Sequence, residues 1–150
     1  MPSLKKVVEH AEKICIANGV RLTPKRKKVL SSLLKSKRAL SAYELVEVCR
    51  EEFGDTMPAM TIYRILDFLE SEQLAHRLNL ANKYVACSHI TCSHDHDAPQ
   101  FLICQQCDKV QEVCMSKSTI KALKKDISGA GFKLINPQIE LNCICNECSH

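Results

Sequence analysis

The chain has 150 residues, an apolar fraction of 45% and a formal net charge of +4. This length suits one domain or two small ones, and the apolar fraction is ordinary for a globular protein. No apolar run approaches the roughly 18 residues of a membrane span, and the N-terminal sequence lacks a secretory signal. We therefore expect a cytoplasmic protein that has no membrane partner.

Charge and cysteine content narrow the function further. Residues 1–41 contain eleven Lys and Arg against two acids, whereas residues 88–150 contain six Lys against seven Asp and Glu. A basic N-terminal part fits a polyanion such as nucleic acid, although a solvated helix face has the same composition. Ten cysteines in a chain without a secretory signal indicate metal or redox chemistry rather than disulfides.

Apolar spacing predicts four helices in the first half. The first covers residues 4–15 and stops at Asn18-Gly19. The other three start at recognisable signals: Thr23-Pro24, the capping box of Ser41 with Glu44, and Pro58. Two short strands follow, at 75–80 and 83–85, and the Ala81-Asn82 spacing between them suits a tight hairpin. Helices followed by a small hairpin indicate a winged helix-turn-helix.

The second half has a different pattern. Residues 88–98 lose the apolar periodicity and are rich in His, Asp, Cys and Ser, which is typical of a hinge. Beyond it we predict strands at 101–103 and 110–113, a helix at 120–127 and a strand at 132–141. The predicted fold class is α+β, with a winged helix-turn-helix domain joined by a hinge to a small α/β domain.

Two Cys-x-x-Cys pairs, Cys104/Cys107 and Cys145/Cys148, are separated by 37 residues. Each pair lets two thiolates of one turn reach the same ion, and two pairs complete a tetrahedron with no open position. A structural zinc ion would stabilise a domain of about 50 residues, whose core is small. A thiol-redox site is the alternative, but the βαβ pattern that accompanies such sites is absent.

The fourth predicted helix carries the candidates for reading DNA bases. In a helix-turn-helix the N-terminal residues of the recognition helix reach base edges, which here are Thr61, Tyr63 and Arg64. Basic residues around the start of the second helix are candidates for phosphate contacts: Arg21, Lys25, Arg26, Lys27 and Lys28. Ordinary exposed side chains would give the same pattern, so both interpretations stand at this point.

Further metal-ligating residue types lie outside the cysteine pairs. They are His76, Cys87, His89, Cys92, His94, His96, Glu112 and Cys114. A mixed Cys, His and carboxylate set suits Zn²⁺. A site formed where the hinge meets the first domain can fix the orientation of two domains, which is the physical basis of a sensor. Taken singly, such residues are common without any metal, and that alternative also stands.

Five motifs together resemble the ferric uptake regulator family of dimeric bacterial metalloregulators, and are most similar to its zinc-sensing branch. The resemblance covers nearly the whole chain. It rests on Arg21-Leu22-Thr23-Pro24-Lys25-Arg26, Ser41-Ala42-Tyr43-Glu44-Leu45, the run from Thr61 to Leu69, Tyr84-Val85-Ala86-Cys87, and the run from Phe101 to Cys107.

The resemblance implies a winged-helix DNA-binding domain at 1–87, a hinge at 88–99 and a dimerisation domain at 100–150 that holds the structural zinc. It also implies a regulatory zinc site formed by His76, Cys87, His96 and Glu112, with His94 in reserve for His96. The thiolate of Cys87 argues against iron, because iron-sensing members typically use histidine and carboxylate there. One departure is that Cys143 stands close to the second Cys pair and is a competing ligand.

The expected protein is thus a zinc-loaded homodimeric repressor that binds palindromic operator DNA and controls zinc-uptake genes. It would hold two Zn²⁺ ions per chain, one structural and one regulatory, and would be no enzyme and take no small organic substrate. The alternatives are a sensor of another metal or of peroxide in the same family, a zinc-stabilised interaction module without sensing, and a thiol-redox enzyme.

Overall fold

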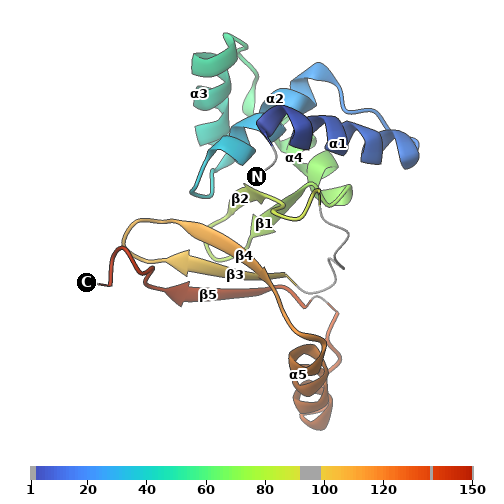
Figure 1. The fold of residues 1–150 in the computed structure, drawn as a ribbon, viewed down its shortest axis with the longest axis vertical. Helices are drawn as coiled ribbons and strands as arrows, with labels where there is room; N and C mark the ends of the chain where they lie inside the picture. The colour runs from blue at the N-terminus through green and yellow to red at the C-terminus, as the bar shows by residue number, and fades with distance from the viewer. Residues whose placement is uncertain (1–2, 92–98, 136, 150) are drawn as a thin grey trace. The chain divides into compact units, whose positions relative to one another are not determined.

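The computed structural model describes residues 3–91, 99–135 and 137–149. The chain divides into two compact units, residues 1–93 and 94–150. Within the described residues, the first unit contains four helices and a hairpin, and the second contains a three-stranded sheet and one helix (Figure 1). The predicted α+β fold class is confirmed. Among the described helices, none is both long and apolar enough to cross a membrane.

The four helices of the first unit begin at the capping signals expected from the sequence or within one residue of them. They are α1 (Leu4–Ala17), α2 (Pro24–Lys35), α3 (Ala42–Phe53) and α4 (Ala59–Ser71). Thr23 accepts a hydrogen bond from the backbone N–H of Arg26, and Ser41 and Glu44 make both hydrogen bonds of a capping box. Pro58 is the N-cap of α4 rather than its first residue.

The hairpin after α4 consists of β1 (Ala75–Leu78) and β2 (Lys83–Ala86), which pair antiparallel. Its register joins Leu78 to Lys83, so the connecting loop has the four residues 79–82. The predicted strand at 75–80 is therefore two residues too long. Asn82 takes a positive φ of 51° and its side chain accepts a hydrogen bond from Arg77, which closes this longer turn.

One apolar core holds the first unit together. Its fully buried side chains come from every helix and from the hairpin, and include Cys15, Leu30, Leu45, Leu66 and Ala75. Leu40 forms an isolated antiparallel bridge to Tyr84, which ties the α2–α3 connection to β2. Burial of this apolar surface is the main force that fixes α4 and the hairpin in place.

The second unit is a mixed sheet. Its strands are β3 (Pro99–Cys104), β4 (Val110–Cys114) and β5 (Ile139–Cys143), and α5 (Lys117–Gly129) lies between β4 and β5 in sequence. The order is β4-β3-β5, with β3 antiparallel to β4 and parallel to β5. The register pairs Cys104 with Cys143 at one end of the sheet, so the chain leaves both strands close together.

Two segments differ from what the sequence predicts, one in each unit. The strand predicted at 132–141 starts only at Ile139, because Pro137 has no N–H to donate and Gly131 takes a positive φ of 89°. Ile90, within the predicted hinge, is 4% exposed and belongs to the core of the first unit. The remainder of the hinge up to Ala98, from Cys92 onward, lies outside the described residues.

Candidate metal centres and nucleic-acid interface

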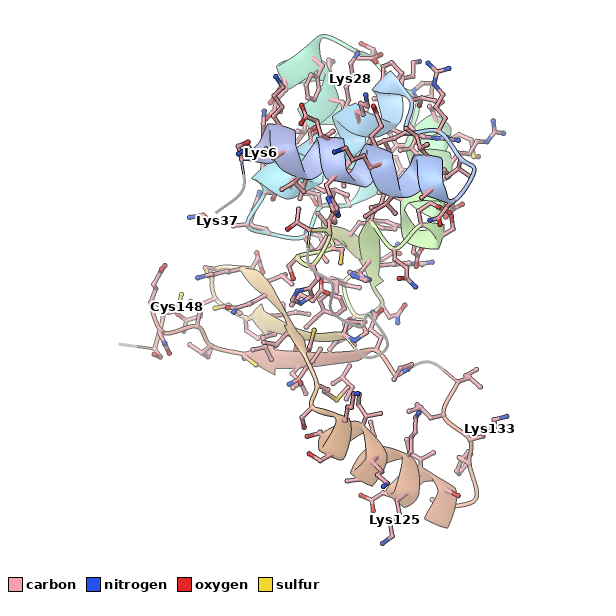
Figure 2. The ribbon with its side chains drawn as sticks, turned by 45° about the vertical axis from the view of Figure 1, so that its right-hand side comes forward. Lys6, Lys28, Lys37, Lys125, Lys133 and Cys148 are labelled. Atoms are coloured by element: carbon pink, nitrogen blue, oxygen red, sulfur yellow. The ribbon has the colours of Figure 1, made fainter. Side chains whose placement is uncertain are left out.

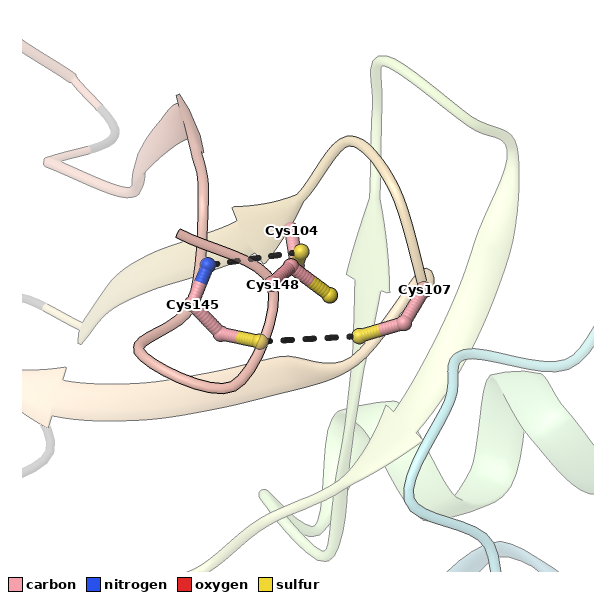
Figure 3. Close-up of side chains that lie close together, drawn as sticks. All are labelled: Cys104, Cys107, Cys145 and Cys148. Atoms are coloured by element: carbon pink, nitrogen blue, oxygen red, sulfur yellow. Dashed lines mark hydrogen bonds between the residues drawn. The ribbon is translucent and has the colours of Figure 1, made fainter. Parts of the chain in front are cut away.

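The four cysteines of the two Cys-x-x-Cys pairs converge on one point. Their Sγ atoms all lie within 4.8 Å of one another, and those of Cys107 and Cys145 are 3.7 Å apart (Figure 3). A tetrahedral zinc ion with Zn–S bonds of about 2.3 Å places its sulfurs about 3.8 Å apart. The donor set and the spacing therefore fit Zn²⁺. We call these four residues the four-cysteine site.

Backbone hydrogen bonds shape the two turns that carry these thiols. The N–H of Asp108 donates to the carbonyl of Cys104, and Asp108 takes a positive φ of 61°. In the second turn, the N–H of Cys148 donates to the carbonyl of Cys145. The N–H of Cys145 also donates to the Cys104 sulfur at 3.4 Å, which links the two turns (Figure 3). Each turn thus holds its two sulfurs on one side.

The same contacts shift the pKa values of the thiols in opposite directions. Backbone N–H groups of Cys107, Cys145 and Gln106 stabilise the thiolate of Cys104 and lower its pKa to about 6. The sulfur of Cys145, together with burial, raises the pKa of Cys148 to about 12. For Cys107 the N–H of Lys109 acts to lower the pKa, but the Cys104 sulfur and burial outweigh it and raise the pKa overall. A metal ion here would displace the protons of Cys107 and Cys148.

Cys143, predicted as a competing ligand, lies on β5 and is not one of the four clustered residues. Its carbonyl accepts a hydrogen bond from the N–H of Gln105, and the Asn142 side chain accepts another from the Gln105 amide. These bonds fasten β5 to the first cysteine turn. The geometry therefore assigns Cys145, as its spacing predicted, to the four-cysteine site.

A second pair of metal-ligating groups lies on the hairpin. The ring of His76, on β1, and the thiol of Cys87, just after β2, bring ligand atoms within 4.8 Å of each other. The ladder explains this: His76 pairs with Val85, and the Cys87 N–H donates to the Leu74 carbonyl, so both side chains share one face of the hairpin. Cys87 is 1% exposed, and its sulfur accepts a hydrogen bond from the N–H of His89.

Three further residues are predicted as regulatory ligands. Glu112 is on β4 of the second unit. His94 and His96 lie outside the described residues. For the regulatory site the structure therefore brings together His76 and Cys87 within the first unit, and the roles of the remaining three residues stay predictions.

The predicted base-reading residues are on the N-terminal half of α4. Arg64 is exposed, whereas Thr61 and Tyr63 are half-buried, and Tyr63 packs against the core. Two large side chains in the first turns of helices are more exposed than Thr61 and Tyr63. They are Met60 of α4, at 63%, and Tyr43 of α3, at 69%. Tyr43 is not among the residues predicted to contact DNA, although its position in the first turn of α3 makes it exposed.

The basic residues near the start of α2 fall into distinct groups. Arg21 and Lys25 are exposed. Lys27 forms an ion pair with Glu12, and Lys28 forms one with Asp55 at 3.1 Å. Arg26 is turned toward the protein, with its guanidinium 3.7 Å from the centre of the Phe68 ring. Figure 2 shows further lysines, including Lys6 and Lys37 on the helical unit and Lys125 and Lys133 on the other.

A unit of four helices and a hairpin with exposed basic side chains, on the same chain as four clustered cysteines that fit a metal ion, is the arrangement of a metal-binding transcription regulator. Residues 17–142 match the profile of the Ferric uptake regulator family. The chain therefore belongs to that family and is a DNA-binding metalloregulator rather than an enzyme.

Individual relatives agree with this assignment. The zinc uptake regulation protein of Escherichia coli (strain K12) is 34% identical over 144 residues, which cover 96% of this chain and 82% of that protein. A solved structure of a zinc uptake regulator complexed with zinc and DNA is 30% identical, with a TM-score of 0.87 and coverage of 99% of this chain and 96% of that one. The peroxide operon regulator of Bacillus subtilis (strain 168) is 25% identical over 132 residues, 87% of this chain and 86% of that protein.

Proposed function

We propose that the protein is a zinc-responsive repressor that binds palindromic operator DNA as a homodimer and controls zinc-uptake genes. Each chain would hold one structural zinc in the four-cysteine site and one regulatory zinc. The observation that carries the zinc assignment is the approach of the Cys87 thiol to the His76 ring within 4.8 Å. A sulfur and an imidazole nitrogen together favour a borderline ion such as Zn²⁺ over harder ions.

The regulatory zinc site would be completed by Glu112 and by one hinge histidine, His96 or His94. Such a site joins ligands from both units of the chain. Metal bound there favours one arrangement of the units over the others by its differential affinity, which is how a ligand shifts a conformational equilibrium. Loss of zinc would release the two winged helices from the spacing that an operator requires.

The DNA-binding surface would centre on α4. Arg64 is exposed and has the guanidinium geometry that pairs with guanine, and Thr61 and Tyr63 lie within one turn of it. Arg21 and Lys25 are exposed near the start of α2 and would contact phosphate. The relative solved with zinc and DNA supports DNA as the partner of this fold.

Homodimer formation is supported by the apolar side chains that the second unit leaves in solvent. Helix α5 contains no fully buried residue. Phe132 is 75% exposed and Ile135 is 91% exposed, and Leu141 and Ile144 are also exposed. Large apolar side chains left exposed in one small unit favour an interface, and a second copy of the chain is the proposed occupant.

Metal selectivity of DNA binding tests the proposal. Operator sequences would first be selected from a random duplex pool with zinc-loaded protein, and affinity would then be titrated against buffered free Zn²⁺, Fe²⁺ and Mn²⁺. We expect zinc to promote binding at the lowest free concentration. A response to iron or manganese instead would indicate a sensor of another metal or of peroxide, and DNA binding without any metal response would contradict sensing altogether.

A further inference from the structure

Arg26 differs from the other basic residues around the start of α2 because its guanidinium contacts an aromatic ring and a backbone carbonyl. Its guanidinium carbon lies 3.7 Å from the centre of the Phe68 ring, a close cation–π contact. The same guanidinium donates a hydrogen bond of 2.7 Å to the backbone carbonyl of Arg21. Lys25, the preceding residue, is exposed. The two neighbours therefore differ: Lys25 is exposed, whereas Arg26 is half-buried and its guanidinium is already held by two contacts within the protein.

Arg26 links α2 to α4 and to the connection between α1 and α2. Arg21 belongs to the connection between α1 and α2, Arg26 to the first turn of α2, and Phe68 to α4. A second contact joins the same elements, because the Asn18 amide donates to the carboxylate of Glu72 at the end of α4. The connection before α2 is thus fastened to the C-terminal half of α4 at two points.

Phe68 transmits this constraint to the recognition surface. It lies four positions after Arg64 on α4, and residues with that spacing share one face of a helix. Phe68 is also half-buried and packed against the core of the unit. A guanidinium stacked on its ring limits rotation of α4 about its own axis, and that rotation decides where Arg64 points.

We propose that Arg26 is a positioning residue for DNA recognition, which acts through Phe68 to orient α4, and that it does not contact phosphate. This inference rests on the proposed DNA-binding function. It replaces the phosphate-contact role that the sequence pattern predicted for Arg26, and it leaves that role with Arg21 and Lys25.

Salt dependence separates a positioning role from a phosphate contact. The full-length, zinc-loaded chain would be compared as wild type, Arg26→Gln and Lys25→Gln on selected operator DNA and on a scrambled duplex, each at several salt concentrations. Each phosphate contact contributes about 0.9 to the slope of log affinity against log salt. We expect Lys25→Gln to lower the slope by about 0.9 and to weaken both duplexes alike. Arg26→Gln should leave the slope unchanged and reduce the preference for operator by about fivefold to tenfold.

Two changes of Phe68 complete the design. Phe68→Leu removes the ring and should reproduce the loss of preference, and adding Arg26→Gln to it should cause little further loss, because both changes break one contact. Phe68→Tyr keeps the ring and should restore near wild-type preference. Thermal unfolding midpoints of all variants identify any that fail to fold.

Three results would overturn the inference. A fall in slope for Arg26→Gln equal to that of Lys25→Gln would make Arg26 a phosphate contact. Equal weakening on both duplexes with an unchanged slope would make it a purely structural residue. Independent effects of Arg26→Gln and Phe68→Leu would remove the coupling on which the positioning role depends. If zinc-loaded wild type bound no duplex at all, the proposed function itself would fail, which is a separate outcome.

Discussion

The Sγ atoms of Cys107 and Cys145 lie 3.7 Å apart although the two residues are 38 positions apart in sequence. That distance matches the edge of a ZnS₄ tetrahedron, which is about 3.8 Å. The second unit has a three-stranded sheet whose buried side chains include Phe101 and Cys104, while its helix has none fully buried. A metal ion that holds its last segment against its first turn would therefore supply much of its stability.

Substitution of single cysteines should show which thiols bind the structural zinc. Cys107→Ser is expected to lose about one zinc ion per chain and to unfold the second unit at low temperature, because structural zinc binding and folding are coupled. Zinc content by atomic absorption and hydrogen exchange of β3–β5 amides would measure both effects. Cys143→Ser is the matched control, and it should keep its zinc and its amide protection. The opposite order of effects would assign the ligand role to Cys143.

Zinc affinity of the four-cysteine site should fall as pH falls. The pKa of Cys148 is raised to about 12 and that of Cys107 is also raised, so at pH 7 both thiols carry protons that zinc must displace. The apparent affinity is therefore expected to drop by at least about 100-fold per pH unit. Below the Cys104 pKa of about 6, a third proton competes and the dependence steepens. Competition with a chelator at pH values between about 5.5 and 8, on both sides of the Cys104 pKa of about 6, would measure this pH dependence. A flat profile would contradict the thiolate assignment.

The capping box of α3 offers a direct test of the first unit. Ser41 accepts a hydrogen bond from the Glu44 N–H at 3.1 Å, and the Glu44 carboxylate accepts one from the Ser41 N–H. Ser41→Ala should lower the free energy of unfolding by about 1 kcal/mol, measured by urea denaturation. Ser128→Ala changes an exposed serine of α5 and should have an effect below about 0.5 kcal/mol. Equal effects of the two changes would show that the cap contributes nothing specific.

Arg64 is expected to carry base recognition. Arg64→Ala should cost about 1–3 kcal/mol of operator binding and broaden the selected sequence, since a bidentate contact to a base is lost. Fluorescence anisotropy on operator and point-substituted duplexes would measure both changes. Lys133→Ala removes a positive charge from the second unit and serves as the control. Unchanged base preference in Arg64→Ala would move recognition to other residues of the helix.

Local chemistry explains which parts of the fold could be predicted. The starts of α2 and α3 depend on Thr23 with Pro24 and on Ser41 with Glu44, which are neighbours in sequence, so the sequence alone identified them. The sequence predicts the end of β1 two residues too late, because the four-residue loop depends on the positive φ of Asn82. The start of β5 was misplaced because apolar residues before Pro137 look like a strand but are exposed, as Ile135 shows.

The candidate sites also differ in how far the sequence predicts them. The four cysteines could be grouped from their spacing because metal coordination demands that spacing. The partners of Arg26 and Lys28 could not be predicted, because Phe68 lies on α4 and Asp55 in the α3–α4 connection, both distant in sequence. Basic residues that look equivalent in sequence thus differ in whether their charge is available to DNA.

The most direct test of zinc sensing is operator affinity measured against free zinc for wild type and Cys87→Ala, with Cys114→Ala as a control thiol. Wild type and the control should gain affinity by about 5- to 150-fold as zinc rises, the usual range of coupling between two sites. Cys87→Ala should keep its structural zinc and bind operator weakly at every zinc concentration. If Cys87→Ala followed the wild-type curve, Cys87 would not be a ligand of the sensing site and the regulatory role proposed for it would be wrong.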